Sequence, residues 1–215
     1  MEIKPAEESI KAKGRKVIEF WLGKAESDPA EAGRKNKIWY GNNPEVDRKI
    51  KEDFGELFDL AVSGNLDSWS HQPYPGLALI ILLDQFTRNT YRGTPLAFSN
   101  DKKALEIARQ MTKLKLDQKL STVGRAFLYH PFEHSENLKD QDDSVSLFSA
   151  LVTESKGEWK KLAQGFLDYA VQHRDIIRQF GRFPHRNAIL RRISSPAEMD
   201  FLNRDRRSWG QQAKK

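Results

Sequence analysis

The feature that most constrains this chain is a seven-residue apolar run, Leu77–Leu83, that ends directly in polar side chains. Asp84, Gln85, Arg88, Asn89 and Arg92 follow it. Periodicity alone fits either a buried strand or a buried helix, but the segment continues beyond strand length and therefore favours a helix. Charged groups attached to a buried element are costly unless they are paired or line a site. The segment therefore predicts a polar site next to the hydrophobic core.

The rest of the chain shows helical periodicity. Apolar residues recur at intervals of three and four, and no pair of segments has the alternation of a strand hairpin. We expect a single all-α domain over residues 1–215 with about eight to ten helices, and with residues 1–8 and 205–215 as frayed ends.

Local signals predict several helix boundaries. Asn43-Pro44 and the capping box Ser195-Pro196-Ala197-Glu198 predict helix starts, and Gly181 predicts a helix end. Residues 24–42 are expected to form a loop because they contain helix breakers. Pro131 is expected to break or restart a helix, since proline lacks an amide donor.

Composition narrows the functional classes. The 215 residues include no cysteine, which excludes disulfides, thiolate nucleophiles and cysteine metal sites. No apolar run is long enough for a membrane helix, and the acidic N-terminus lacks the apolar core of a signal peptide. We therefore expect a soluble, cytoplasmic protein without a membrane partner. The net charge of +6 favours anionic partners in a general way.

A second polar cluster follows Gly181 and contains Arg182, His185, Arg186 and Asn187. A loop that leads into a helix offers backbone amides to an anion, and the arginine fork binds a carboxylate or phosphate with two hydrogen bonds. The cluster predicts either an anion cradle or a polar network that ties helices together.

A third cluster lies at His130-x-x-Glu133-His134. Its spacing matches the inverted zinc-protease motif. Pro131 lies inside the pattern and no third ligand is evident, so we expect neither a metal nor another cofactor. His134 with Glu136 is a plausible pocket pair, because a neighbouring carboxylate tunes a histidine as an acid–base group.

These clusters carry a resemblance to a bacterial family, domain-of-unknown-function family nine hundred and twenty-four, which has a tetratricopeptide-like helical fold. The similarity covers nearly the whole chain and is most specific at residues 82–95, 127–136 and 180–187. It implies a single domain of stacked antiparallel helix pairs but assigns no catalytic roles. The chain differs from the family pattern at Thr87, where the family has proline, and at His130 and Glu133, where it has methionine-like residues.

The sequence leads to one principal hypothesis about function, a polar, arginine-rich pocket for a small anionic ligand. His134 and His185 are candidates for proton transfer if catalysis occurs, and no reaction class is indicated. The expected ligand-binding residues are Asp84, Gln85, Arg88, Asn89, Arg92, His134, Glu136, Arg182, His185, Arg186 and Asn187.

Two alternatives remain open. A non-catalytic helical scaffold would use a concave surface of stacked helices to bind a peptide or protein. Nucleic-acid binding would use the arginines between residues 172 and 192 and the basic tail, although no recognised motif accompanies them.

Overall fold

The computed structural model describes residues 5–204, with side chains from residue 12 onward. The described chain is mostly helical and contains no strand, so the predicted single all-α domain is confirmed. Frayed ends are expected at 1–8 and 205–215: residues 1–4 and 205–215 lie outside the described residues, and residues 5–8 belong to α1. The elements are α1 (Pro5–Trp21), η1 (Gly23–Glu26), α2 (Pro29–Trp39), α3 (Pro44–Val62), η2 (Asp67–His71), α4 (Pro73–Ile80), η3 (Ile81–Phe86), α5 (Thr87–Thr90), η4 (Pro95–Phe98), α6 (Asp101–Lys113), η5 (Asp117–Lys119), α7 (Thr122–Glu133), α8 (Leu138–Glu154), α9 (Gly157–Phe180), η6 (Pro184–Arg186) and α10 (Pro196–Arg204).

The apolar run forms the centre of the core, as its sequence predicts. Residues 77–83 are fully buried and lie in α4 and η3, against α1, α3, α6 and α7. Aromatic rings from distant segments meet there: Trp21 contacts Phe86 and Phe127 edge to face, with ring centroids 5.4 and 6.0 Å apart. A second, smaller cluster contains Ile176, Ile177 and Phe183.

The helix that follows the apolar run is not regular. The backbone amide of Thr87 donates to the carbonyl of Leu82, five residues back, so η3 is a π-helical turn. The Thr87 hydroxyl also donates to the Leu83 carbonyl at 2.7 Å. Such wide turns inside α-helices occur frequently at functional sites. Here the turn carries Asp84 and Gln85, both buried, into the protein interior.

Two local predictions were wrong. Residues 24–42 hold η1 and α2 instead of a loop, because Asp28 caps α2 and Pro29 occupies its first turn. Lys35 and Trp39 then donate to the carbonyl of Trp21 at the end of α1, at 2.9 and 2.8 Å, which ties α2 to the core. Pro131 lies inside α7, in its last turn, and its neighbours His130 and Phe132 are buried, so the helix continues with one backbone hydrogen bond fewer.

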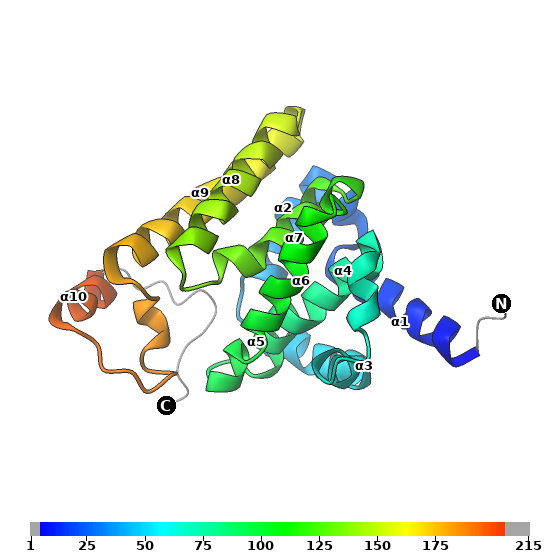
Figure 1. Ribbon diagram of the computed structural model, residues 1–215, viewed down its shortest axis with the longest axis horizontal. Helices are drawn as coiled ribbons and strands as arrows, with labels where there is room; N and C mark the ends of the chain where they lie inside the picture. The colour runs from blue at the N-terminus through cyan, green and yellow to red at the C-terminus, as the bar shows by residue number, and fades with distance from the viewer. Residues whose placement is uncertain (1–4, 205–215) are drawn as a thin grey trace.

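The remaining boundary predictions are confirmed. Asn43 caps α3, Gly181 ends α9 with φ of 69°, and Ser195 and Glu198 form the reciprocal bonds of a capping box. Figure 1 shows α8 and α9 packed as an antiparallel pair that projects from the rest, with α10 at the opposite end from α1. The tetratricopeptide-like stacking stays a prediction. No described helix has the length and apolar character needed to cross a membrane.

Candidate functional site

The polar residues that follow the apolar run lie inside the molecule, in a network that joins segments distant in sequence. Arg88 Nη1 lies 2.9 Å from Asp84 Oδ1 and 2.9 Å from Asp101 Oδ1. Arg186 approaches the other oxygen of Asp101 at 3.4 Å, and His134 Nδ1 lies 2.8 Å from Asp84 Oδ1. We call Asp84, Arg88, Asp101, His134 and Arg186 the central network. It connects η3, α5, α6, the end of α7 and η6.

Asp84 is the anchor of the central network because its carboxylate has several donors and no exposure to solvent. Arg88 and His134 bind one oxygen, and Gln85 Nε2 donates to the other at 2.5 Å. Burial raises the pKa of Asp84, but Arg88 and His134 outweigh this effect and hold the pKa below its ordinary value. An ionised Asp84 requires His134 to donate from Nδ1, which leaves Nε2 as the acceptor nitrogen.

The two arginines of the central network are buried in different ways. Arg88 is held by carboxylates on both sides, whereas the Arg186 guanidinium lies between the rings of Phe98 and Phe183, 4.6 Å from each centroid. Arg186 Nη2 also donates to the His134 carbonyl at 3.0 Å. Burial lowers the pKa of Arg186 to about 10, so it remains charged at neutral pH. Two guanidinium groups therefore face two aspartates.

A second layer of titratable groups borders the central network. His130 Nδ1 lies 2.6 Å from the Ala126 carbonyl, so its Nε2 accepts from the Tyr40 hydroxyl at 3.1 Å. On the other side, His173 Nδ1 lies 3.1 Å from Glu133 Oε1. The ring centroid of His134 is 5.8 Å from that of His130 and 6.4 Å from that of His173. Three imidazoles thus lie side by side in the protein interior.

Burial shifts the pKa values of the acids and of the bases in this layer in opposite directions. It raises the pKa of Glu133 to about 8, assisted by the nearby Asp84 charge. It lowers the pKa of His130 to about 4, and burial together with the Arg88 charge lowers that of His134 to about 3. At neutral pH the carboxyl is therefore largely protonated and the imidazoles are neutral. Neighbouring titratable groups whose pKa values are shifted in opposite directions are typical of acid–base sites.

Asn89 and Arg92 lie on a different face of the same helical segment. Arg92 Nε and Asn89 Nδ2 donate to the carboxylate of Asp47 on α3, at 2.8 and 2.7 Å. Asp47 thus joins α3 to α5. The structure does not bring these two predicted site residues to His134.

The predicted residues near the C-terminal end form another set of pairs. Arg182 binds both carboxylate oxygens of Glu198, at 2.6 and 2.8 Å. Arg192 binds both oxygens of Glu136, at 2.7 and 3.0 Å, and Asn187 Oδ1 accepts from Arg192 Nε. We call Arg182, Glu198, Arg192, Glu136 and Asn187 the C-terminal clamp, because it fastens the segment after α9 to α10 and to the loop after α7. His185 lies beside this clamp, with its ring 5.3 Å from that of Phe183.

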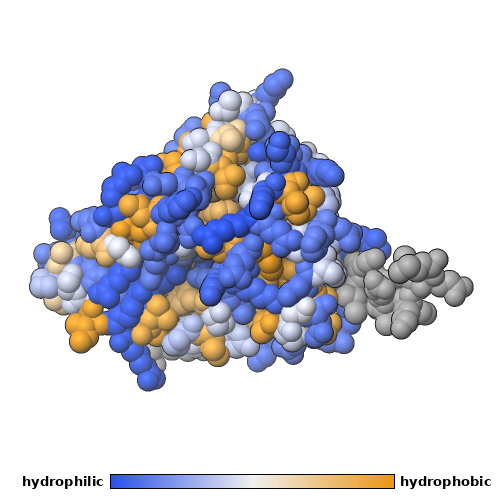
Figure 2. Space-filling model, viewed as in Figure 1, coloured by the Kyte–Doolittle hydropathy of each residue, from blue (hydrophilic) through white to orange (hydrophobic). Residues whose placement is uncertain are grey.

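The arginines between residues 172 and 192 are largely paired, although the sequence suggested a basic surface. Five of the six lie within 4.0 Å of a carboxylate. On the face seen in Figure 2, polar residues predominate and apolar ones form small scattered groups. Ion pairing of this kind leaves little unbalanced positive charge on the segment.

Several residues of the site were not predicted from the sequence. Asp101 reads as part of a helix start, and Asp47 as the solvated face of an amphipathic helix, so neither gives a signal. Tyr40 falls in the segment assigned to a loop. His130 and Glu133 are part of a recognised spacing, but His130 uses its ring nitrogens on Ala126 and Tyr40. Within residues 5–204, no group of three or more histidine, aspartate or glutamate side chains is arranged to hold a metal ion.

Comparison with known proteins finds a matching family model and a similar solved structure. The model of a family described as "Bacterial protein of unknown function (DUF924)" matches residues 17–206, a range that contains the whole central network. A solved structure of a protein of unknown function from Agrobacterium tumefaciens is 32% identical, with a TM-score of 0.76, and the alignment covers 91% of this chain and 99% of that one. Among curated proteins no sequence matches.

Proposed function

The chain belongs to this bacterial family of unknown function, and we propose that it binds a small anionic ligand at the central network, with His134 as the group that accepts a proton. The observation that carries the proposal is the Asp84–His134 pair, with its 2.8 Å contact at Nδ1. A carboxylate on one ring nitrogen fixes the tautomer and orientation of an imidazole and prepares the other nitrogen for a ligand.

The surroundings of His134 support a role beyond structure. Its side chain keeps 15% exposure, whereas Asp84 beneath it keeps none. Nε2 has no hydrogen-bond partner within the described part of the chain. A negative charge next to this ring would favour the protonated imidazole and would therefore raise the pKa of His134, which burial lowers. Ligand binding and proton uptake would then reinforce each other.

The charge balance of the central network favours a singly charged ligand. Asp84 and Asp101 offset Arg88 and Arg186, and a protonated Glu133 adds no charge. A dianion such as phosphate would meet two aspartates at close range, while a carboxylate needs only one or two donors. Arg186 Nε is buried and has no hydrogen-bond partner within the described residues, so it is one such donor.

A thermal-unfolding experiment tests the proposal. Acetate should raise the Tm, while acetamide and phosphate, at matched ionic strength, should not. At about ten times Kd a ligand adds about 1.4 kcal/mol, which corresponds to about 3–5 °C for a chain of this size. Equal responses to acetate and acetamide would contradict recognition of charge.

Two arginine variants show which of the two clusters is responsible for the rise in Tm with acetate. Arg88→Met removes a guanidinium from the central network and should abolish the acetate effect, and Arg182→Met in the C-terminal clamp should retain it. If Arg88→Met does not fold, His134→Asn provides the same test with a smaller change. A loss of stability in Arg88→Met without any acetate response in the parent would instead favour the scaffold hypothesis.

The two alternatives stay predictions. The pairing of five arginines with carboxylates speaks against nucleic-acid binding by residues 172–192. A peptide-binding scaffold would use an extended surface and would respond to neither acetate nor changes at His134.

A further inference from the structure

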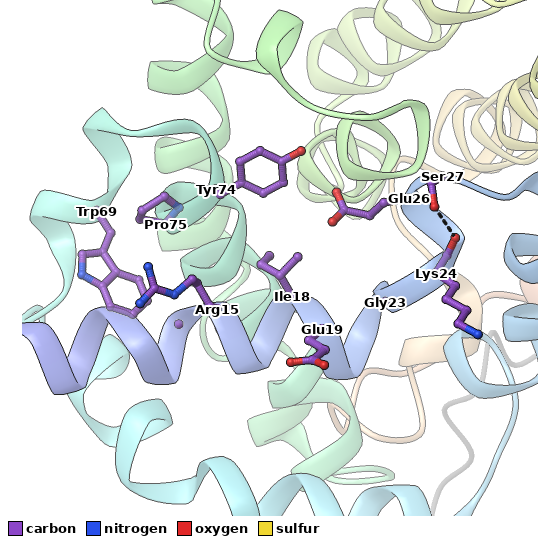
Figure 3. Close-up of a pocket in the computed structure, with 11 residues that line it drawn as sticks. Arg15, Ile18, Glu19, Gly23, Lys24, Glu26, Ser27, Trp69, Tyr74 and Pro75 are labelled. Atoms are coloured by element: carbon purple, nitrogen blue, oxygen red, sulfur yellow. Dashed lines mark hydrogen bonds between the residues drawn. The ribbon is translucent and has the colours of Figure 1, made fainter.

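A cavity of about 740 Å³ lies between α1, η1, η2 and the start of α4. None of the residues that line it belongs to the central network. Figure 3 shows how its walls are arranged. Ile18 projects from α1, Trp69 and Pro75 line one end, and Tyr74 and Glu26 face each other at the other end. Its size is within the range of small-molecule sites.

The shape of the cavity depends on one glycine. A Cβ on Gly14 would come within 2.6 Å of the Trp69 ring, so the indole lies directly against the backbone of α1. Trp69 is 5% exposed and is therefore a fixed wall. Tyr74, by contrast, is 43% exposed and can be substituted without opening the core.

Glu26 is the unusual member of this lining. It is half-buried, and its carboxylate has only neutral donors: the Ser121 hydroxyl at 3.1 Å and the Tyr74 hydroxyl. Within the described part of the chain it forms no ion pair with lysine, arginine or histidine. Burial raises the pKa of Glu26 in spite of these two hydrogen bonds, which shows that the lost hydration is not fully replaced.

We infer that this cavity binds an organic ammonium ion with an apolar body, the cation pairing with Glu26 and the body lying against Trp69, Tyr74 and Ile18. A carboxylate without a cationic partner, set among aromatic faces, is suited to a desolvated cation, because both the charge and the ring quadrupoles attract it. Arg15 and Lys24 also line the cavity, but both are exposed and therefore more strongly screened by water and salt.

Three probes of similar shape test the inference: phenethylammonium, 2-phenylethanol and 3-phenylpropanoate. Titration calorimetry at pH 7 should give a Kd on the order of 0.1–1 mM for the ammonium ion, at least about tenfold tighter than for the alcohol. Binding should persist in His134→Asn, which separates this site from the anion site proposed above. Equal binding of the alcohol, or tighter binding of the carboxylate, would overturn the inference.

Three variants assign the contacts. Glu26→Gln keeps the hydrogen-bonding shape and should reduce the preference for ammonium over alcohol to less than about threefold. Tyr74→Leu removes a ring face and should weaken ammonium binding by about twofold to tenfold. Glu19→Gln, on an exposed carboxylate that lines the same cavity, is the matched control and should leave the preference unchanged. A preference that survives Glu26→Gln would overturn the assignment.

Discussion

The central network and the C-terminal clamp are built from the same residue types but differ in how their charges are satisfied. In the clamp, Arg182 and Arg192 each bind both oxygens of one carboxylate, a geometry in which donor and acceptor match. In the central network, carboxylates are shared, and two buried imidazoles, His130 and His173, and a protonated Glu133 lie beside the partly exposed His134. Arginine enrichment is therefore common to both regions, and the buried histidine–carboxyl layer is what distinguishes the candidate site.

The largest expected difference concerns stability. Asp84→Asn removes the charge that faces Arg88 and His134, and it leaves a buried guanidinium with one partner fewer. Removing one member of a buried ion pair costs about 3–5 kcal/mol. Urea denaturation at pH 7 should show this loss as a lower midpoint with an unchanged slope. A loss below about 1 kcal/mol would mean that the central network contributes no more than an exposed pair.

The next prediction uses the pH dependence of the same measurement. The pKa of Glu133 is about 8 in the folded state, because of burial, and near 4.5 in the unfolded chain. Between these values the unfolded carboxyl releases its proton while the folded one keeps it, so the wild-type loses stability as pH rises. Glu133→Gln should remove this loss, and its advantage should grow by up to about 1.4 kcal/mol per pH unit until about pH 8. Parallel curves for variant and parent from pH 5 to 8 would refute the protonated state.

The smallest expected effect is in the C-terminal clamp. Glu198→Gln keeps the capping box, because glutamine also fits that motif, but removes the charge next to Arg182. The Arg182 hydrogen bonds lower the pKa of Glu198 to about 2, so its ionisation stabilises the fold above about pH 4.5 and this contribution disappears as pH falls toward 2. The variant should differ from the parent by a constant amount, smaller than for Asp84→Asn, from pH 5 to 9. A slope in that range would show that the clamp also titrates near neutrality.

Sequence reasoning succeeded where the interaction is local. The start of α3 follows from the Asn43-Pro44 pair, and the capping box at Ser195 and Glu198 from a three-residue spacing. The predictions were wrong where the local sequence favours no structure strongly and contacts with residues distant in sequence determine whether a helix forms. α2 forms within a segment rich in breakers because Trp39 and Lys35 satisfy carbonyls of α1, and α7 passes through Pro131 because its flanks are buried.

The sequence by itself determined the all-α class, the fully buried helix at residues 77–83 and the presence of costly polar groups at its end. It could not determine which polar residues meet, because Asp47, Asp101 and Glu136 are more than ten positions away from the arginines they bind. Only the tertiary structure separated the central network from the C-terminal clamp. The physical reason is that a buried charged group forms an ion pair with the oppositely charged group that helix packing places next to it. Helix packing in turn depends on the whole hydrophobic core.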